Sequence, residues 1–214
     1  MQWRLLDPLD DEQRRTVLAR TRRRRYRRGE VVFHEGDPGD TLHLIERGHV
    51  AIKRATPLGD VAALVVLGPG DQFGELAVLG DGHPRSSTVQ ALDAVETLTL
   101  HRDQFEELRR AHPAIDGILV MALAADVRRL SDRLLEALYV PVTARVYRRL
   151  AELAHIYGDA DIPLTQDDLA GLAGTSRPSA NKALRTAEAA GLVEVGRGRV
   201  TIVDLDELAR RGGT

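Results

Sequence analysis

Six short segments rich in β-branched residues recur between residues 30 and 100, and they constrain the fold more than any other feature of this sequence. Each is bounded by Gly, Pro or Asp, and turn-forming residues such as Pro57-Leu58-Gly59 lie between them. Short strands at this spacing favour an antiparallel sandwich or barrel. The expected strands are Val31–His34, Leu42–Ile45, Val50–Arg54, Val61–Leu67, Thr88–Leu92 and Val95–Leu100.

A long helical repeat follows, starting at Pro113 and reaching about Val140. Its apolar residues are spaced by alternating steps of three and four, as in a heptad seam. They are Val120, Leu123, Val127, Leu130, Leu134 and Ala137. This seam predicts a parallel homodimer, and the alternative is one helix that packs on its own domain.

The C-terminal third reads as three helices followed by a β-hairpin. The expected helices cover 142–157, 166–173 and 177–190, with a loop at Gly158–Asp161. The hairpin joins Leu192–Val195 to Arg199–Val203 through Gly196-Arg197-Gly198, which we expect to form a three-residue turn. This order is the layout of a winged helix-turn-helix. Shorter helices are expected near 9–20 and 103–110.

The helix-turn-helix segment has capping residues in the right places. Thr165 and Ser176 can cap its two helices, Gly174 suits the left-handed turn between them, and Pro178 lies in the first turn of the second helix. Ala180 and Leu184 face inward. The predicted outward side chains are types that bind base edges and phosphates: Arg177, Ser179, Asn181, Lys182 and Arg185. Arg197 and Arg199 on the hairpin are predicted to reach flanking phosphates.

The charge of the chain is small in total but segregated. The formal net charge is −2, with 30 basic and 32 acidic residues. Residues 1–28 carry ten Arg and four acids, whereas residues 29–140 carry ten basic and eighteen acidic residues. Thr175–Arg199 holds five basic residues and two acids. A local positive field suits phosphate binding, and the total excludes indiscriminate coating of DNA. The Arg20–Arg28 run alone is interpreted as a solvated surface.

Several classes of protein are excluded by composition. The absence of Cys excludes disulfides, iron–sulfur clusters and thiolate metal sites. The longest apolar stretches, Val61–Leu67 and Gly117–Ala125, are far shorter than the ~20 residues of a membrane-spanning helix. The charged start of the chain does not read as a signal peptide. We therefore expect a cytoplasmic protein with no membrane partner.

A second motif lies in the β-rich half, in Phe73–Leu79 and Pro84–Val89. Gly74 frees a backbone N–H at the start of a short helical turn, and Arg85 is a fork that can hold a phosphate through two hydrogen bonds. Ser86 adds a hydroxyl, and Glu75 can accept from a ribose hydroxyl. The alternative interpretation is a surface Glu–Arg pair on two loops.

Together the two motifs resemble the cyclic-AMP receptor/fumarate–nitrate regulator (CRP/FNR) family of bacterial transcription factors. The resemblance covers essentially the whole chain. It implies an α+β fold with a β-roll (double-stranded β-helix or jelly roll) sensor domain at 1–112, a dimerisation helix at 113–140 and a winged helix-turn-helix at 141–214. It also implies a homodimer that binds a pseudo-palindromic operator in double-stranded DNA and is not an enzyme.

Site residues follow from this resemblance position by position. Gly74, Glu75, Arg85 and Ser86 fall on cyclic-nucleotide contacts, and Ser131 falls on a long-helix position that reaches the adenine. The complete predicted ligand site also includes Leu76, Ser87 and Leu130. The predicted DNA contacts are Thr143, Ser176, Arg177, Ser179, Asn181, Lys182, Arg197 and Arg199.

Three departures from the family pattern leave alternatives open. Leu130 replaces a Thr that bonds the adenine amine, Ser87 replaces a small apolar residue, and Pro178 replaces a Glu that reads cytosine. Cyclic AMP is the favoured effector and no cofactor is required. One alternative is a family member that binds DNA without a ligand.

Two further hypotheses concern partners and chemistry. A remote alternative is a metal-dependent β-barrel enzyme with His34, His43 and His49 as ligands. In this family the edge that carries Arg22–Arg25 can also touch RNA polymerase, which is therefore a possible partner.

Overall fold

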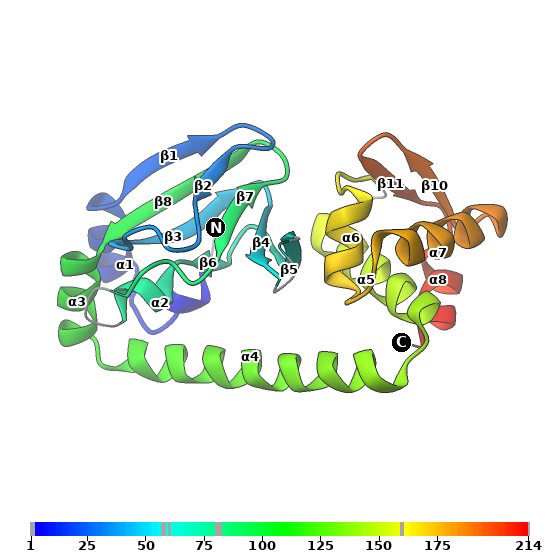
Figure 1. The fold of residues 1–214 in the computed structure, drawn as a ribbon. Helices are drawn as coiled ribbons and strands as arrows, with labels where there is room; N and C mark the ends of the chain where they lie inside the picture. Colours follow the sequence, from blue (N-terminus) through cyan, green and yellow to red (C-terminus); the bar gives the residue numbers. More distant parts are fainter. Residues whose placement is uncertain (1–2, 57–58, 60, 80–82, 159–160, 214) are drawn as a thin grey trace. The chain divides into compact units, whose positions relative to one another are not determined.

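The computed structural model describes residues 3–56, 59, 61–79, 83–158 and 161–213, which form two compact units (Figure 1). The first unit runs up to Ile52 and from Leu67 to Arg128, and the second covers Lys53–Val66 and the chain from Arg129 onward. The predicted turn at Pro57-Leu58-Gly59 and the predicted loop at Gly158–Asp161 include residues outside the described part.

Two four-stranded sheets form the β-rich half of the chain, as the recurrent short segments predict (Figure 1). The first has the order β1 (Arg22–Tyr26), β8 (Val95–His101), β3 (Thr41–Arg47) and β6 (Gln72–Phe73). The second has the order β2 (Val31–Phe33), β7 (Thr88–Ala91), β4 (Val50–Ala55) and β5 (Val61–Leu67). In both, strands distant in sequence are neighbours, so residues far apart in the chain come to share one interior.

Strand β1 is missing from the sequence prediction, which interprets Arg20–Arg28 only as a solvated surface. Its arginines are indeed exposed, but the backbone pairs antiparallel with β8, from Arg22 opposite Thr99 to Tyr26 opposite Val95. Acids on neighbouring strands balance part of the charge. Arg23 contacts Glu46 at 2.8 Å and Glu96 at 3.4 Å, and Arg25 also contacts Glu96.

Two apolar clusters hold the first unit together. One lies between the sheets and contains Ile45, Val50, Phe73, Val89, Ala91 and Val95. The other joins the first sheet to the short turn Arg4–Leu6 and to helices α1 (Asp11–Ala19) and α3 (Arg102–Ala111). Trp3 in this second cluster donates its indole N–H to the carbonyl of Ile45 at 2.9 Å. Burial of this kind contributes roughly 25 cal/mol per Å² of apolar surface.

Helix α4 (Ala114–Tyr139) confirms the predicted long helix. Only Ile115 and Leu119 near its start are buried. The predicted seam side chains are exposed in the single chain, with Val120, Val127, Leu130 and Leu134 each more than 60% accessible. A continuous apolar stripe of this length is unusual on the surface of a monomer.

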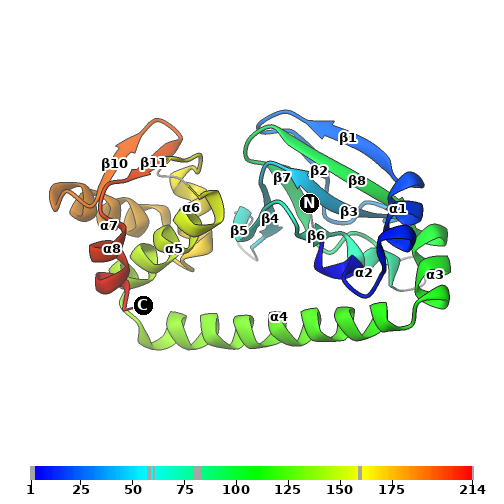
Figure 2. The same ribbon diagram turned by 180° about the vertical axis from the view of Figure 1, so that it is seen from behind.

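The second unit contains α5 (Val142–Tyr157), whose buried face includes Val146, Leu150 and Leu153. Around it lie α6 (Gln166–Leu172), α7 (Arg177–Ala189), α8 (Leu205–Gly212) and a sheet of β10 (Val193–Gly196), β11 (Arg199–Ile202) and β9 (Asp161–Ile162) (Figure 2). The sequence prediction lacks α8. Arg148 of α5 donates to the carbonyl of Gly212 at 2.9 Å and so caps the C-terminal end of α8.

The predicted three-residue turn at Gly196-Arg197-Gly198 is wrong. Gly196 pairs with Arg199 in the ladder, so only Arg197 and Gly198 form the turn. Gly198 adopts a φ of 67° and Arg197 a negative φ, which is the combination of a type II turn. The β10–β11 hairpin, which corresponds to the wing of the predicted winged helix-turn-helix, therefore has a shorter turn than predicted. Within the described residues, no helix has both the length and the apolarity to cross a membrane.

Candidate functional site

Gly74 begins the first candidate site with a backbone shape that other residues rarely adopt. Its φ is 85°, and it lies at the N-cap of α2 (Glu75–Val78). A Cβ at this position would approach the Nη1 atom of Arg85 to 2.7 Å and the carbonyl oxygen of Thr41 to 2.9 Å. Glycine therefore lets the start of α2, β3 and Arg85 meet at one point.

Arg85 is buried at the centre of this site, with only 4% of its surface exposed. Its Nη1 donates to the carbonyls of Thr41 at 2.8 Å and Gly74 at 3.3 Å, and its Nη2 donates to Thr41 Oγ1 at 2.8 Å. The guanidinium lies over the ring of Phe33, 4.1 Å from its centroid. The Nε atom is buried and lacks a hydrogen-bond partner among the described residues. A buried guanidinium whose Nε–H lacks a partner among the described residues fits an anion such as a phosphate.

Burial also changes the acid–base properties of the two charged groups in the site. It lowers the pKa of Arg85, while the nearby carboxylates of Asp40 and Asp37 oppose the change. It raises the pKa of Glu75, and Asp126 on α4 raises that pKa further. Paired shifts of this kind are common at binding sites, although structural ion pairs also cause them.

The structure brings only part of the predicted ligand site together. Gly74 and Arg85 are in contact, Glu75 begins α2, and Leu76 is 46% exposed. Ser86 is exposed and Ser87 is partly buried, directly after Arg85. Leu130 and Ser131 are exposed on the part of α4 that belongs to the second unit, so their place in the site stays a prediction.

Two residues beside Arg85 were missed by the sequence prediction, Thr41 and His43 (the latter considered only as a metal ligand). Both lie on β3, more than forty positions before Arg85 in the chain. The alternation of side chains along a strand could have identified these two residues, because it places Thr41 and His43 on the same face of the sheet. Among the described residues, no three His, Cys, Asp or Glu side chains form a group that could hold a metal ion.

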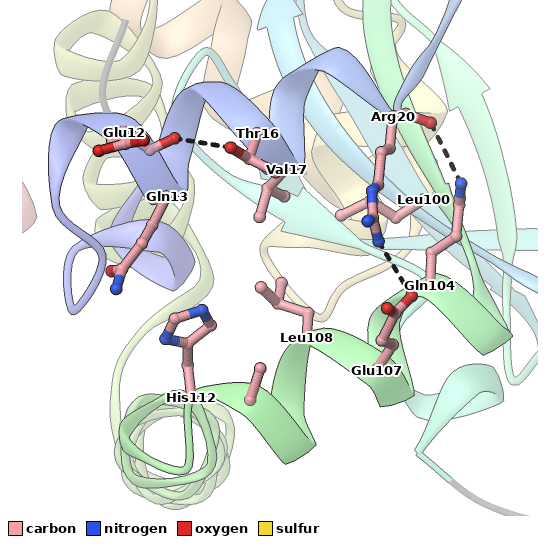
Figure 3. A pocket seen from close by; sticks show the side chains of 11 residues that line it. Glu12, Gln13, Thr16, Val17, Arg20, Leu100, Gln104, Glu107, Leu108 and His112 are labelled. Carbon is pink, nitrogen blue, oxygen red and sulfur yellow. Dashed lines mark hydrogen bonds and ion pairs between the residues drawn. The ribbon is translucent and has the colours of Figure 1, made fainter.

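A separate cavity of about 320 Å³ lies between α1 and α3 (Figure 3). Its floor is apolar, from Val17, Leu100 and Leu108. Arg20 and Glu107 form an ion pair of 2.9 Å at its rim. No residue of the predicted ligand site lines this cavity.

The second candidate site is formed by α6, α7 and the hairpin. Thr165 and Asp168 form a reciprocal capping box at the start of α6, Gly174 adopts a φ of 59°, and Ser176 caps α7. Ala180 and Leu184 are fully buried, which confirms the predicted inward face. These features fix the orientation of α7 within the unit.

The outward face of α7 carries the positive charge. Arg177, Lys182 and Arg185 are exposed, as are Arg197 and Arg199 on the hairpin and Thr143 at the start of α5. Arg177 makes a 3.3 Å ion pair with Asp167 of α6. Ser179 and Asn181 are less accessible than predicted. Asn181 Oδ1 is buried without a hydrogen-bond partner in the described part of the chain, because its position on α7 borders the buried face.

Glu188 connects α7 to the hairpin. It accepts hydrogen bonds from the backbone N–H of Val195 at 3.1 Å and from Arg185 at 2.8 Å. These two bonds lower the pKa of Glu188. The second candidate site thus consists of a helix and a hairpin that are joined through the carboxylate of Glu188.

Two protein families match the two halves of the chain. A cyclic nucleotide-binding domain matches residues 23–112, and a Crp-like helix-turn-helix domain matches residues 144–211. Together they cover most of the sequence and contain both candidate sites.

Curated relatives match over nearly the full length. The chain is 35% identical over 191 residues to the "CRP-like cAMP-activated global transcriptional regulator" of Mycobacterium tuberculosis, covering 86% of this chain and 85% of the relative. It is 31% identical to the "Cyclic AMP receptor protein" of Thermus thermophilus, covering 90% of each chain.

Solved structures with the predicted α+β fold class, a β-roll, a long helix and a helix-turn-helix, are also similar to this chain. The catabolite activator protein of Thermus thermophilus is similar with a TM-score of 0.57 and 30% identity, over 97% of this chain and 98% of the other. The regulator CLP of Xanthomonas campestris has the same fold, with a TM-score of 0.77, 22% identity, and coverage of 90% and 99%. This chain therefore belongs to the CRP/FNR family of DNA-binding transcription regulators, whose members are not enzymes.

Proposed function

We propose that this protein is a homodimeric transcription regulator whose affinity for DNA is gated by a cyclic nucleotide, with cyclic AMP as the favoured effector. The observation that carries the proposal is Arg85, a buried guanidinium beside the helical turn that starts at Glu75, whose Nε–H lacks a partner in the described part of the chain. The proposed ligand residues are Gly74, Glu75, Leu76, Arg85, Ser86, Ser87, Leu130 and Ser131. Relatives named as cyclic-AMP-activated support this choice of effector.

The proposed domains are a sensor at 1–112, a dimerisation helix at 113–140 and a DNA-binding domain at 141–214. The exposed apolar seam of α4 supports dimerisation, because a second copy would remove it from water. A two-fold dimer would present two α7 helices to a pseudo-palindromic operator. The proposed DNA contacts are Thr143, Ser176, Arg177, Ser179, Asn181, Lys182, Arg197 and Arg199.

Calorimetry with cyclic AMP and cyclic GMP, combined with operator binding at a stated salt concentration, tests this function. The operator would be selected from a random pool of duplexes. We expect saturable heat with cyclic AMP and tighter operator binding in its presence, because a ligand shifts only an equilibrium between states that it binds differently. No heat together with unchanged operator affinity would refute the gated version.

A ligand-independent regulator is the second candidate, and Leu130 favours it. Its side chain cannot replace the hydrogen bond that a Thr would offer to adenine, and an unmet hydrogen bond typically costs about 1–3 kcal/mol. Tight operator binding in the absence of nucleotide supports this candidate.

We further propose a cytoplasmic location and a contact with RNA polymerase through the arginines of β1. Arg22 and Arg24 are exposed on that strand. Reversal of both charges is expected to reduce transcription activation and leave operator binding unchanged. Loss of both activities would argue against a polymerase contact.

A further inference from the structure

A buried histidine lies inside the first unit, where the proposed function gives it no role. His43 is only 4% exposed. Its ring stacks on Phe73, with centroids 4.7 Å apart and planes inclined by 13°, and it lies 5.9 Å from the ring of Phe33. The guanidinium of Arg85 also lies over the ring of Phe33, so the histidine and the arginine share one aromatic neighbour.

Hydrogen bonds connect His43 to Arg85 on one side and to β8 on the other. Thr41 Oγ1 lies 2.8 Å from Arg85 Nη2 and 3.4 Å from His43 Nε2. His43 Nδ1 lies 3.3 Å from Thr97 Oγ1, and Thr97 is fully buried. The chain Arg85–Thr41–His43–Thr97 therefore joins the arginine through β3 to β8.

The direction of the first bond is fixed by its groups: a guanidinium only donates, so Thr41 Oγ1 accepts from Arg85. In the proposed arrangement the hydroxyl proton of Thr41 goes to His43 Nε2, which requires Nε2 to be unprotonated. The remaining ring proton lies on Nδ1 and donates to Thr97. All three bonds then run one way.

The surroundings of His43 keep its ring neutral, as this arrangement needs. Burial lowers the pKa of His43 to about 3, and the positive charges of Arg85 and Arg24 act in the same direction. The charged groups that act on the ring are thus Arg85 from the segment before β7 and Arg24 from β1. A protonated ring would offer a second donor to Thr41 and place a second positive charge beside Arg85.

We propose that His43 is a positioning residue for the anion site: as a neutral acceptor it orients the hydroxyl of Thr41, which holds the plane of the Arg85 guanidinium. This inference rests on the proposed function, because it assigns the positioned arginine to a cyclic-nucleotide phosphate. It adds Thr41 and His43 to the site as groups that act through Arg85 and do not touch the ligand.

Three variants of the full chain test the role in binding. Thr41→Val removes the hydroxyl at nearly constant volume, and Thr41→Ser restores it. His43→Phe keeps a ring against Phe73 but removes both nitrogens. We expect Thr41→Val and His43→Phe each to weaken cyclic-AMP binding about tenfold, because each removes a group that orients the Arg85 guanidinium. Thr41→Ser should bind as the wild type does.

The double variant separates positioning from general destabilisation. Because both changes break the same chain, the combined loss should be close to either single loss rather than their product. Thermal melting of each variant identifies any that fails to fold. Binding within twofold of the wild type for both single variants, or multiplied losses in the double variant, would overturn the proposal.

Nuclear magnetic resonance of the imidazole tests the inference without any nucleotide. We expect the Nδ1–H tautomer of His43 and no titration of its ring between pH 8 and pH 5. We also expect the Arg85 Nε–H resonance to shift in His43→Phe and not in Thr41→Ser. An Nε2–H tautomer, or titration near pH 6.5, would refute the role of His43. If the ring behaves as expected but the wild type binds no cyclic nucleotide, the proposed function fails and the hydrogen-bond chain stands.

Discussion

Arg85 in the first unit and Arg177 in the second are both proposed to contact phosphate or base groups, and their environments are opposite. Arg85 is 4% exposed and its Nη atoms are bonded to Thr41 and Gly74. The Arg177 side chain is 65% exposed and forms an ion pair with Asp167. We infer that a pre-organised, buried site such as that of Arg85 concentrates its binding energy in one residue, whereas an exposed surface divides it among many.

The largest expected effect is at the buried arginine. Arg85→Leu removes the guanidinium and leaves the carbonyl of Thr41 without its donor, so we expect cyclic-AMP affinity to fall by about 100-fold or more. Calorimetry measures this loss. The control is Arg23→Leu, because Arg23 is an exposed, ion-paired arginine of the same unit. Equal effects of the two changes would contradict the contrast between buried and exposed arginines.

A pH effect on stability between pH 6.5 and pH 5 is next in size, and it arises at His43 of the first unit. The pKa of His43 is about 3 in the folded protein and about 6.5 when unfolded. Between these values the unfolded chain binds more protons, so the free energy of unfolding falls as the pH falls. From pH 6.5 to pH 5 this group should cost about 2 kcal/mol. Urea unfolding of wild type and His43→Phe at both pH values gives the difference, which would be zero if His43 titrated normally.

On α7, the helix proposed to read the DNA, we expect a smaller loss of operator affinity from a single substitution. Arg177→Ala should weaken operator binding by about tenfold and relax specificity at one base pair. Cyclic-AMP affinity should stay unchanged. Fluorescence anisotropy with matched and single-base-substituted operators measures both quantities. A loss of more than 100-fold would mean that operator binding depends on this one residue, as cyclic-AMP binding is expected to depend on Arg85.

The smallest effect is expected at the wing. Arg197→Ala should reduce DNA affinity about threefold, equally for all sequences, and lower the salt slope of binding by about one. Salt titrations of the variant and the wild type test this. A sequence-dependent loss would instead indicate that the wing reads bases.

The helix-turn-helix was predictable from sequence because its signals are local. Thr165, Gly174 and Ser176 act on neighbours within a few residues, and all three have the predicted roles. The wing turn was predicted one residue too long, because two glycines flank Arg197 and only the ladder register shows which one pairs.

Other features depend on contacts across the sheet and were not predictable in this way. Strand β1 has neither apolar alternation nor favourable β-propensity, and it forms because β8 pairs with it and Glu46 and Glu96 balance its charge. The link from Arg85 through Thr41 to His43 joins segments that only the closed fold brings together.

The position of β1 at the end of its sheet has a consequence for how the protein behaves at high concentration. An edge strand offers unpaired backbone N–H and C=O groups to other molecules, which is a common route to aggregation. Here Arg22, Arg23, Arg24 and Arg25 line that edge. A second copy that approached edge to edge would bring like charges together. These arginines therefore also disfavour edge-to-edge association of two copies of the chain.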